Sequence, residues 1–219
     1  MPLDKDHPAE HELTYLARFP AVQRHDVGRL VGAGAQHVVR AYGESEVVKY
    51  PRAKTWRDIF SKLVSPGITP SVDEMERDVA LSSETFGPTV VAPRVEATAE
   101  RDAYTLVQPF LPIDDLLPMH MEDGDLHDEL AQLLDQNRKL LLDHRLWLDV
   151  MGFNGSKLLA AKPYLDNVSL RRNPKPEEPR LAVLDCSLFP APNLSIRGIH
   201  AWVLRHVQAL NLRAYGQRL

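Results

Sequence analysis

The chain has 219 residues, of which 44% are hydrophobic and 26% charged, a composition typical of a folded globular protein. Its formal net charge of -4, without any block of like charges, argues against a protein that binds nucleic acid through phosphate contacts. The single Cys186 excludes an internal disulfide and a multi-cysteine zinc site, and neither an export signal nor a spanning segment is evident, so we expect a cytoplasmic protein without membrane association.

Strands and one helix are expected in the first half of the chain. Residues 27–50 read as three short antiparallel strands broken by glycines, with pairs of valines typical of strands. Residues 71–86 then predict a helix, because Ser71 and Glu74 form a capping box and apolar residues recur at helical spacing. Two further strand candidates, 89–97 and 103–112, follow this helix.

The second half is expected to be mostly helical. Regularly spaced leucines predict a long helix with one apolar face over residues 126–148. Residues 149–170 show no sustained period and read as a loop with brief extended pieces. A hairpin formed by residues 167–170 and 180–185, and a last helix over about residues 195–212, complete the expected order of elements.

Residues that can bind a nucleotide first appear around two glycines. Gly32 and Gly34 lie between two predicted strands, where missing side chains let backbone N–H groups approach a phosphate, although ordinary hairpin turns share this spacing. Lys49, on the next strand, stands where a cation would face the phosphates. Such a lysine needs a counter-ion, and we expect Glu76, on the inward face of the following helix, to pair with it.

This order of glycine loop, strand lysine and helix glutamate resembles the protein-kinase-like superfamily over about residues 27–190. A hinge-like strand ending at Gln108 extends the resemblance, which implies that Gln108 lies at the nucleotide. It also implies an α+β, two-lobe fold. An antiparallel sheet with one helix would form the N-lobe, at about residues 20–110, and a minimal, mostly helical C-lobe would occupy about residues 111–219. The short C-lobe is similar to that of small bacterial kinase-like proteins of the YrbL type.

The resemblance further assigns residues to metal binding and catalysis. Asp185 ends the second hairpin strand and looks like the aspartate of the family's Asp-Phe-Gly motif, which holds magnesium, although Cys186 and Ser187 replace phenylalanine and glycine. Asp149 and Asn154 have the family's spacing of a catalytic aspartate and a metal-binding asparagine.

A second register of the catalytic loop competes with the first. Asn167 lies at a family-like distance from Asp185, but Lys162 stands five residues before it and cannot act as a carboxylate base. If Asn154 is the metal-binding asparagine, residues 155–166 are an insertion relative to the family. If Asn167 is, the chain is a pseudokinase or uses unusual chemistry, and Asp166 becomes the next candidate base. We favour Asp149 as the base.

The sequence therefore predicts an ATP- and magnesium-dependent phosphotransferase whose acceptor, a protein or a small molecule, is unknown. In this hypothesis Lys49 contacts the phosphates, Glu76 fixes Lys49, and Asp185 and an asparagine bind the metal. Asp149 positions the acceptor hydroxyl. A pseudokinase that binds nucleotide or a protein partner without transfer chemistry is the main alternative, and an unrelated α+β structural domain with accidental matches is the other.

Overall fold

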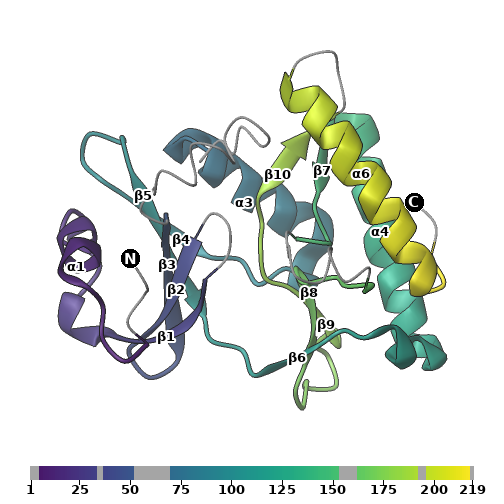
Figure 1. Ribbon diagram of the computed structural model, residues 1–219, viewed down its shortest axis with the longest axis horizontal. Coiled ribbons are helices and arrows are strands. Elements are labelled where there is room, and N and C mark those ends of the chain that lie inside the picture. Colours follow the sequence, from purple (N-terminus) through teal and green to yellow (C-terminus); the bar gives the residue numbers. More distant parts are fainter. Residues whose placement is uncertain (1–4, 34–36, 52–69, 153–161, 192–195, 218–219) are drawn as a thin grey trace. The chain divides into compact units, whose positions relative to one another are not determined.

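The computed structural model describes residues 5–33, 37–51, 70–152, 162–191 and 196–217. Over these residues the protein is a mixed α+β structure with antiparallel sheets, as predicted (Figure 1). The chain divides into two compact units. Unit 1 consists of Met1–Arg77 and Pro93–Phe110, and unit 2 of Asp78–Ala92 and Leu111–Leu219. No helix of the described residues combines the length and the apolar character that crossing a membrane requires.

A five-stranded antiparallel sheet forms the centre of unit 1, in the order β1-β2-β3-β5-β4. Its strands are β1 (Val27–Ala33), β2 (His37–Tyr42), β3 (Glu46–Pro51), β4 (Arg94–Ala97) and β5 (Tyr104–Pro109). The predicted strands are therefore present, since β-branched pairs such as Val47-Val48 favour the pleated, half-buried surface of a sheet. A short helix, α1 (Glu10–Leu16), and the 3₁₀ turn η1 (Arg24–Asp26) precede the sheet and were not predicted.

One face of this sheet packs against α1 and the residues that follow it. Leu16 and Phe19 are buried there against Val48 and Val107, which project from the same face of β3 and β5. Side chains alternate between the two faces of a strand, so the residues between these valines project from the opposite face. The apolar contacts therefore define an inner face of the sheet and leave the other face for different side chains.

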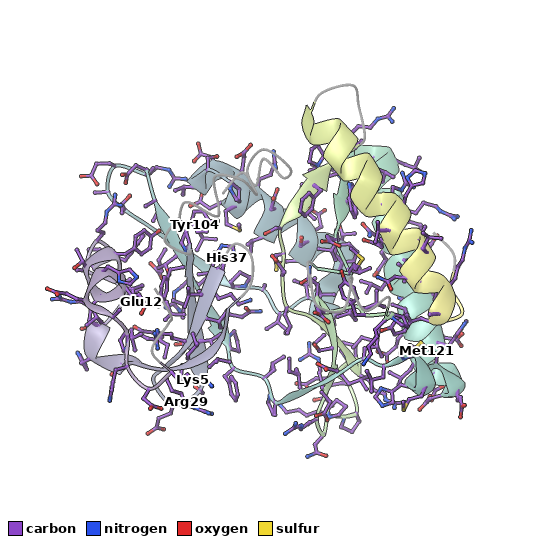
Figure 2. The ribbon with its side chains drawn as sticks, in the orientation of Figure 1. Lys5, Glu12, Arg29, His37, Tyr104 and Met121 are labelled. Carbon is purple, nitrogen blue, oxygen red and sulfur yellow. The ribbon has the colours of Figure 1, made fainter. Side chains whose placement is uncertain are left out.

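A buried ion pair ties α1 to the sheet. The guanidinium group of Arg40 on β2 donates to both carboxylate oxygens of Glu12, at 3.3 Å and 2.9 Å, and both side chains are almost fully buried. The hydroxyl of Tyr50 on β3 donates to the same carboxylate at 2.5 Å. Burial alone would raise the pKa of Glu12, yet the hydrogen bonds from Arg40 and Tyr50 lower it below its ordinary value. Glu12 is therefore a charged structural residue on the sheet side of α1 (Figure 2).

The helix α3 (Val72–Phe86) begins with the predicted capping box. The backbone N–H of Ser71 donates to the Glu74 carboxylate at 2.9 Å, and the Glu74 N–H donates to the Ser71 hydroxyl at 3.2 Å. The helix ends in the 3₁₀ turn η2 (Gly87–Thr89), where Gly87 has a φ of 53°. The capping box and the glycine thus mark both ends of α3, as the sequence indicated.

Unit 2 is built around α4 (Gly124–His144) and α6 (Ile196–Ala214), which run past one another in Figure 1. Two small antiparallel sheets accompany them, and a further 3₁₀ turn, η3 (Pro118–Glu122), precedes α4. The first sheet pairs β7 (Leu146–Leu148) with β10 (Leu188–Pro190), and the second has the order β6-β8-β9, with β6 (Ile113–Asp115), β8 (Val168–Arg171) and β9 (Leu181–Val183). Strands β8 and β9 are the predicted hairpin, whereas β6, β7 and β10 were not predicted.

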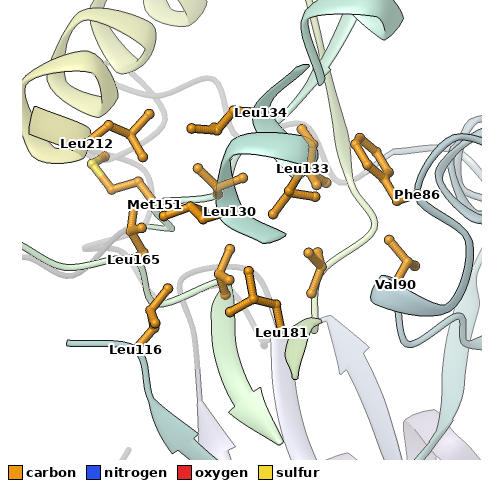
Figure 3. Packing of buried hydrophobic residues seen from close by; sticks show 14 of the residues in the cluster. Phe86, Val90, Leu116, Leu130, Leu133, Leu134, Met151, Leu165, Leu181 and Leu212 are labelled. Carbon is orange, nitrogen blue, oxygen red and sulfur yellow. The ribbon is translucent and has the colours of Figure 1, made fainter. Parts of the chain in front are cut away.

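The core of unit 2 joins these elements. Figure 3 shows Leu130, Leu133 and Leu134 of α4 grouped with Leu181 of β9 and Leu212 of α6. These leucines are buried, which accounts for the apolar stripe that predicted the long helix. The core therefore packs α4 against both the hairpin and α6.

The helix α4 ends earlier than predicted. Arg145 adopts a left-handed backbone conformation, with a φ of 57°, and its N–H donates to the carbonyl of Leu141 as a helix cap. The chain then continues as β7, so Leu148 belongs to a strand and not to the helix. Glycine usually occupies this cap position, and an arginine gives no such signal in the sequence.

Candidate functional site

In unit 1, the predicted nucleotide-binding residues project from one face of the sheet. Directly opposed residues share a face, and the register pairs Gly32 with Val39, Val39 with Lys49, and Lys49 with Leu106. These four residues form a row across β1, β2, β3 and β5, on the face opposite to the one that α1 covers. We call this the lysine face. Lys49 is half-buried there.

The lysine face has open space over its glycine and buried polar groups around it. A Cβ atom built on Gly32 would meet no heavy atom of a described residue within 4 Å, so packing against these residues does not require a glycine at this position. Gln108 lies opposite Val47, two residues along β5 from the lysine row and therefore on the same face, and is 2% exposed. His37 and Tyr104 also belong to this face, and their side chains lie 3.3 Å apart between Nε2 and the hydroxyl (Figure 2). Gly34 lies outside the described residues.

The structure corrects the role assigned to Glu76. Its side chain is 45% exposed, and its carboxylate accepts a hydrogen bond from Arg101 at 2.7 Å. The prediction that Glu76 points inward and pairs with Lys49 is therefore wrong. The buried side of α3 runs through Val72, Met75 and Asp78, which places Glu76 at its margin.

The carboxylate that α3 buries is that of Asp78, which the sequence analysis did not select. Asp78 is 2% exposed and accepts a hydrogen bond from the Leu188 N–H at 3.1 Å. One turn later, the buried hydroxyl of Ser82 donates to the carbonyl of Cys186 at 3.2 Å. Two polar residues of α3 thus hold the segment that follows Asp185.

In unit 2, Asp149 is a buried carboxylate at the end of β7. It is 7% exposed, and its Oδ1 accepts hydrogen bonds from the N–H groups of Met151 at 2.9 Å and Gly152 at 3.2 Å. Its Oδ2 has no hydrogen-bond partner among the described residues. Burial raises the pKa of Asp149 to about 6, the two N–H groups partly oppose this rise, and the nearby charge of Asp185 adds to it.

Asn167 joins the Asp149 loop to the hairpin. Its Nδ2 donates to the backbone carbonyl of Asp149 at 2.7 Å. A carbonyl oxygen can only accept, so the amide nitrogen faces it and the amide oxygen remains for another partner. A Cβ atom on Gly152, whose φ is 69°, would lie 2.9 Å from that oxygen, so a side chain is excluded at this position.

The structure joins the aspartate of the first expected register, Asp149, to the asparagine of the second, Asn167. Asp149 lies with Asn167, eighteen residues later, and Asn154 lies outside the described residues. Asn167 directly precedes β8, and Asp185 follows β9. Because these two strands form an antiparallel hairpin, both residues lie at its open end. Oδ1 of Asp185 accepts from the N–H of Ser187 at 3.0 Å and from its hydroxyl at 2.8 Å.

No protein-family model matches the chain, and no curated protein matches it either. The resemblance to the protein-kinase-like superfamily therefore rests on the residues named above. Their local geometry in each unit is the ground on which a function can be proposed.

Asn137 of α4 holds the strand that carries Asp149. Its Nδ2 donates to the carbonyl of Leu148 at 2.9 Å, and its Oδ1 accepts from the Leu148 N–H at 2.7 Å. A single buried side chain thus satisfies both backbone groups of the residue before Asp149, as a neighbouring strand would. Sequence reasoning missed Asn137 because it lies among the leucines of α4 without any motif.

The group formed by Asp149, Asn167 and Asp185 supplies oxygen donors of the type that Mg²⁺ prefers. The described residues contain no cluster of three His, Cys, Asp or Glu side chains able to hold a metal ion. The carboxylate of Asp185 and the amide oxygen of Asn167 suit a metal that keeps several waters and phosphate oxygens as its remaining ligands. These residues therefore fit magnesium bound together with a phosphate compound.

Proposed function

We propose that the chain is a protein-kinase-like phosphotransferase that uses ATP and magnesium to phosphorylate an acceptor hydroxyl. The observation that best supports this proposal is the state of Asp149. One of its oxygens is fixed by two backbone N–H groups, and the other has no partner among the described residues. A pKa of about 6 suits a general base near neutral pH, because the group is ionised and still accepts a proton.

In this proposal, each residue of unit 2 has one task. Asp149 orients the acceptor hydroxyl through Oδ2 and accepts its proton, and Asn137 and Asn167 hold the backbone of Asp149 in place. Asp185 and the amide oxygen of Asn167 bind the metal. Magnesium bound to ATP would neutralise the charge on the phosphate oxygens during transfer.

The residues of the lysine face are proposed to bind the nucleotide. Lys49 supplies the cation for the phosphates, and the open space over Gly32 lets a phosphate approach the backbone of β1. Gln108, on β5 and two residues before the end of unit 1, would contact the nucleotide. Glu76 has no part in the proposal, because its carboxylate is bound to Arg101.

A pseudokinase that binds nucleotide without transferring phosphate is the second candidate. The contacts of Asp185 favour it, because the hydroxyl of Ser187, which stands where the family has glycine, donates to the carboxylate proposed to bind the metal. The two candidates share nucleotide binding and differ in turnover.

Thermal unfolding with ATP, with and without magnesium, tests the shared part of the proposal. A ligand that binds the folded state raises the midpoint, so we expect a rise that depends on magnesium. Lys49→Met should abolish this rise, whereas Lys175→Met, at an exposed lysine of the hairpin turn, should retain it. No rise at saturating ATP in the wild-type protein would exclude both candidates and leave a structural domain.

Transfer of radiolabelled phosphate from ATP to candidate acceptors separates the two candidates. We expect turnover in the wild-type protein, none in Asp149→Asn, and near wild-type turnover in Asp166→Asn, which removes a less buried acid of the same loop. Nucleotide binding without turnover in the wild-type protein would support the pseudokinase. Full turnover in Asp149→Asn would show that Asp149 is not the base.

A further inference from the structure

A cavity of about 210 Å³ lies in unit 2 between α4, α6 and the start of β7. None of Asp149, Asn167 and Asp185 lines it, and the one residue it shares with the proposed function is Asn137, which holds the strand before Asp149. Its wall combines the apolar residues Leu134, Leu141 and Trp147 with two cationic residues, Arg138 and Arg205. A wall with one apolar side and two cations is typical of a site for an amphiphilic anion.

The charge of this wall is not balanced by the protein. Neither Arg138 nor Arg205 forms an ion pair or a hydrogen bond with a described residue. The one acidic residue of the wall, Asp135, is bound to Lys139 at 2.8 Å, and this bond, more than the charge of Arg138, holds the pKa of Asp135 below its ordinary value. The two arginines therefore leave an excess of positive charge at the cavity, which an anion would neutralise.

The apolar side of the wall is preformed. Trp147 is 3% exposed, and its indole N–H donates to the Pro190 carbonyl at 3.2 Å, so its polar atom is already satisfied. Leu134 is buried beside it in the core of unit 2. A volume of 210 Å³ holds about seven waters, so the cavity suits a ligand with a single ring and is too small for a nucleotide.

We propose that this cavity is a binding site for a small organic anion. Its carboxylate, phosphate or sulfonate group binds to Arg138 and Arg205, and its apolar body packs against Trp147. The proposal does not depend on the phosphotransferase activity, because the site is separate from Asp149 and binding can be measured without turnover.

Calorimetric titration and saturation-transfer NMR of the full chain, with benzoate and benzamide as probes, test this proposal. The two probes share shape and differ in charge, so we expect benzoate to bind at millimolar concentrations, with benzamide roughly tenfold weaker. Arg205→Gln and Arg138→Gln should each weaken benzoate binding by roughly tenfold. Arg213→Gln, an exposed arginine of α6 that does not line the cavity, should leave it unchanged.

A variant that fills the cavity without changing its charge completes the test. Ala131 lines the cavity from α4, so Ala131→Leu should exclude benzoate while both arginines remain. Far-UV circular dichroism checks that each variant folds. The proposal is overturned if benzamide binds as well as benzoate, if neither probe binds, or if benzoate binds Ala131→Leu as it binds the wild-type protein.

Discussion

Replacing Asp149 with asparagine should stabilise the fold at neutral pH while it removes activity. Burial raises the pKa of this carboxyl group from its ordinary value of 3.8 to about 6. At about 1.4 kcal/mol for each pKa unit, that rise corresponds to about 3 kcal/mol. The folded state therefore holds the ionised carboxylate at a cost of about this size, and the neutral amide of asparagine avoids the cost.

The effect has a defined pH dependence. A carboxyl group whose folded pKa lies above its unfolded pKa gives most stability below the unfolded value, and this stability is lost as pH rises through the folded value. At pH 8 the carboxylate is ionised in both states, so Asp149→Asn should be more stable than the wild-type protein by about 3 kcal/mol. Near pH 4 the folded carboxyl group is protonated, and the difference should fall to about 0.5 kcal/mol.

Urea unfolding of both proteins between pH 4 and pH 8 measures this difference. Asp166→Asn is the matched control, since it removes a less buried carboxylate of the same loop. A stability difference that stays constant with pH, or a variant less stable than the wild-type protein at pH 8, would refute the reasoning. The hydrogen bonds to Met151 and Gly152 would then outweigh the cost of burial.

Three further variants test other contacts. Lys49→Met should weaken ATP binding by at least roughly tenfold in calorimetric titration, because it removes the cation proposed for the phosphates; unchanged affinity would remove Lys49 from the site. Asn137→Leu should cost about 2–4 kcal/mol in urea unfolding, since two buried backbone groups lose their partners; wild-type stability would contradict the role of this side chain. Gly152→Ala should cost about 1–3 kcal/mol, because its Cβ would lie 2.9 Å from the Asn167 amide and its φ is positive, whereas Gly32→Ala should leave the unfolding midpoint unchanged.

Local signals in the sequence predicted much of the fold. The capping box at Ser71 and Glu74 depends on residues three apart, and the β-branched pairs depend on neighbours, so both can be read without knowledge of the rest of the chain. The strands β6, β7 and β10 have three residues each and pair with distant segments. Such short strands carry too little periodicity to be detected.

The candidate site was predicted less completely, again because its residues contact partners that are distant in the sequence. Asp78 is buried because its partner is the Leu188 backbone, 110 residues later, and hydrophobic spacing on α3 cannot indicate a buried acid. Glu76 was selected because it adjoins Val72, although the buried side of the helix is centred nearer Asp78. Asp149 was selected by its spacing from Asn154 and not by its burial, which the structure adds. Its partner Asn167 lies eighteen residues away, where a motif with a fixed spacing of five does not reach.

The ion pair between Glu12 and Arg40 makes the segment before the first strand essential to the sheet. A chain shortened to begin after α1 would keep every strand of unit 1 but would lose Glu12 together with Leu16 and Phe19, which cover the face of the sheet that carries Arg40. Exposing this apolar face and losing the ion pair would remove a large part of the stability of a whole domain. A boundary drawn at Val27, where the first strand begins, would therefore yield an unstable protein, and engineered versions of unit 1 need Glu12 and the helix that carries it.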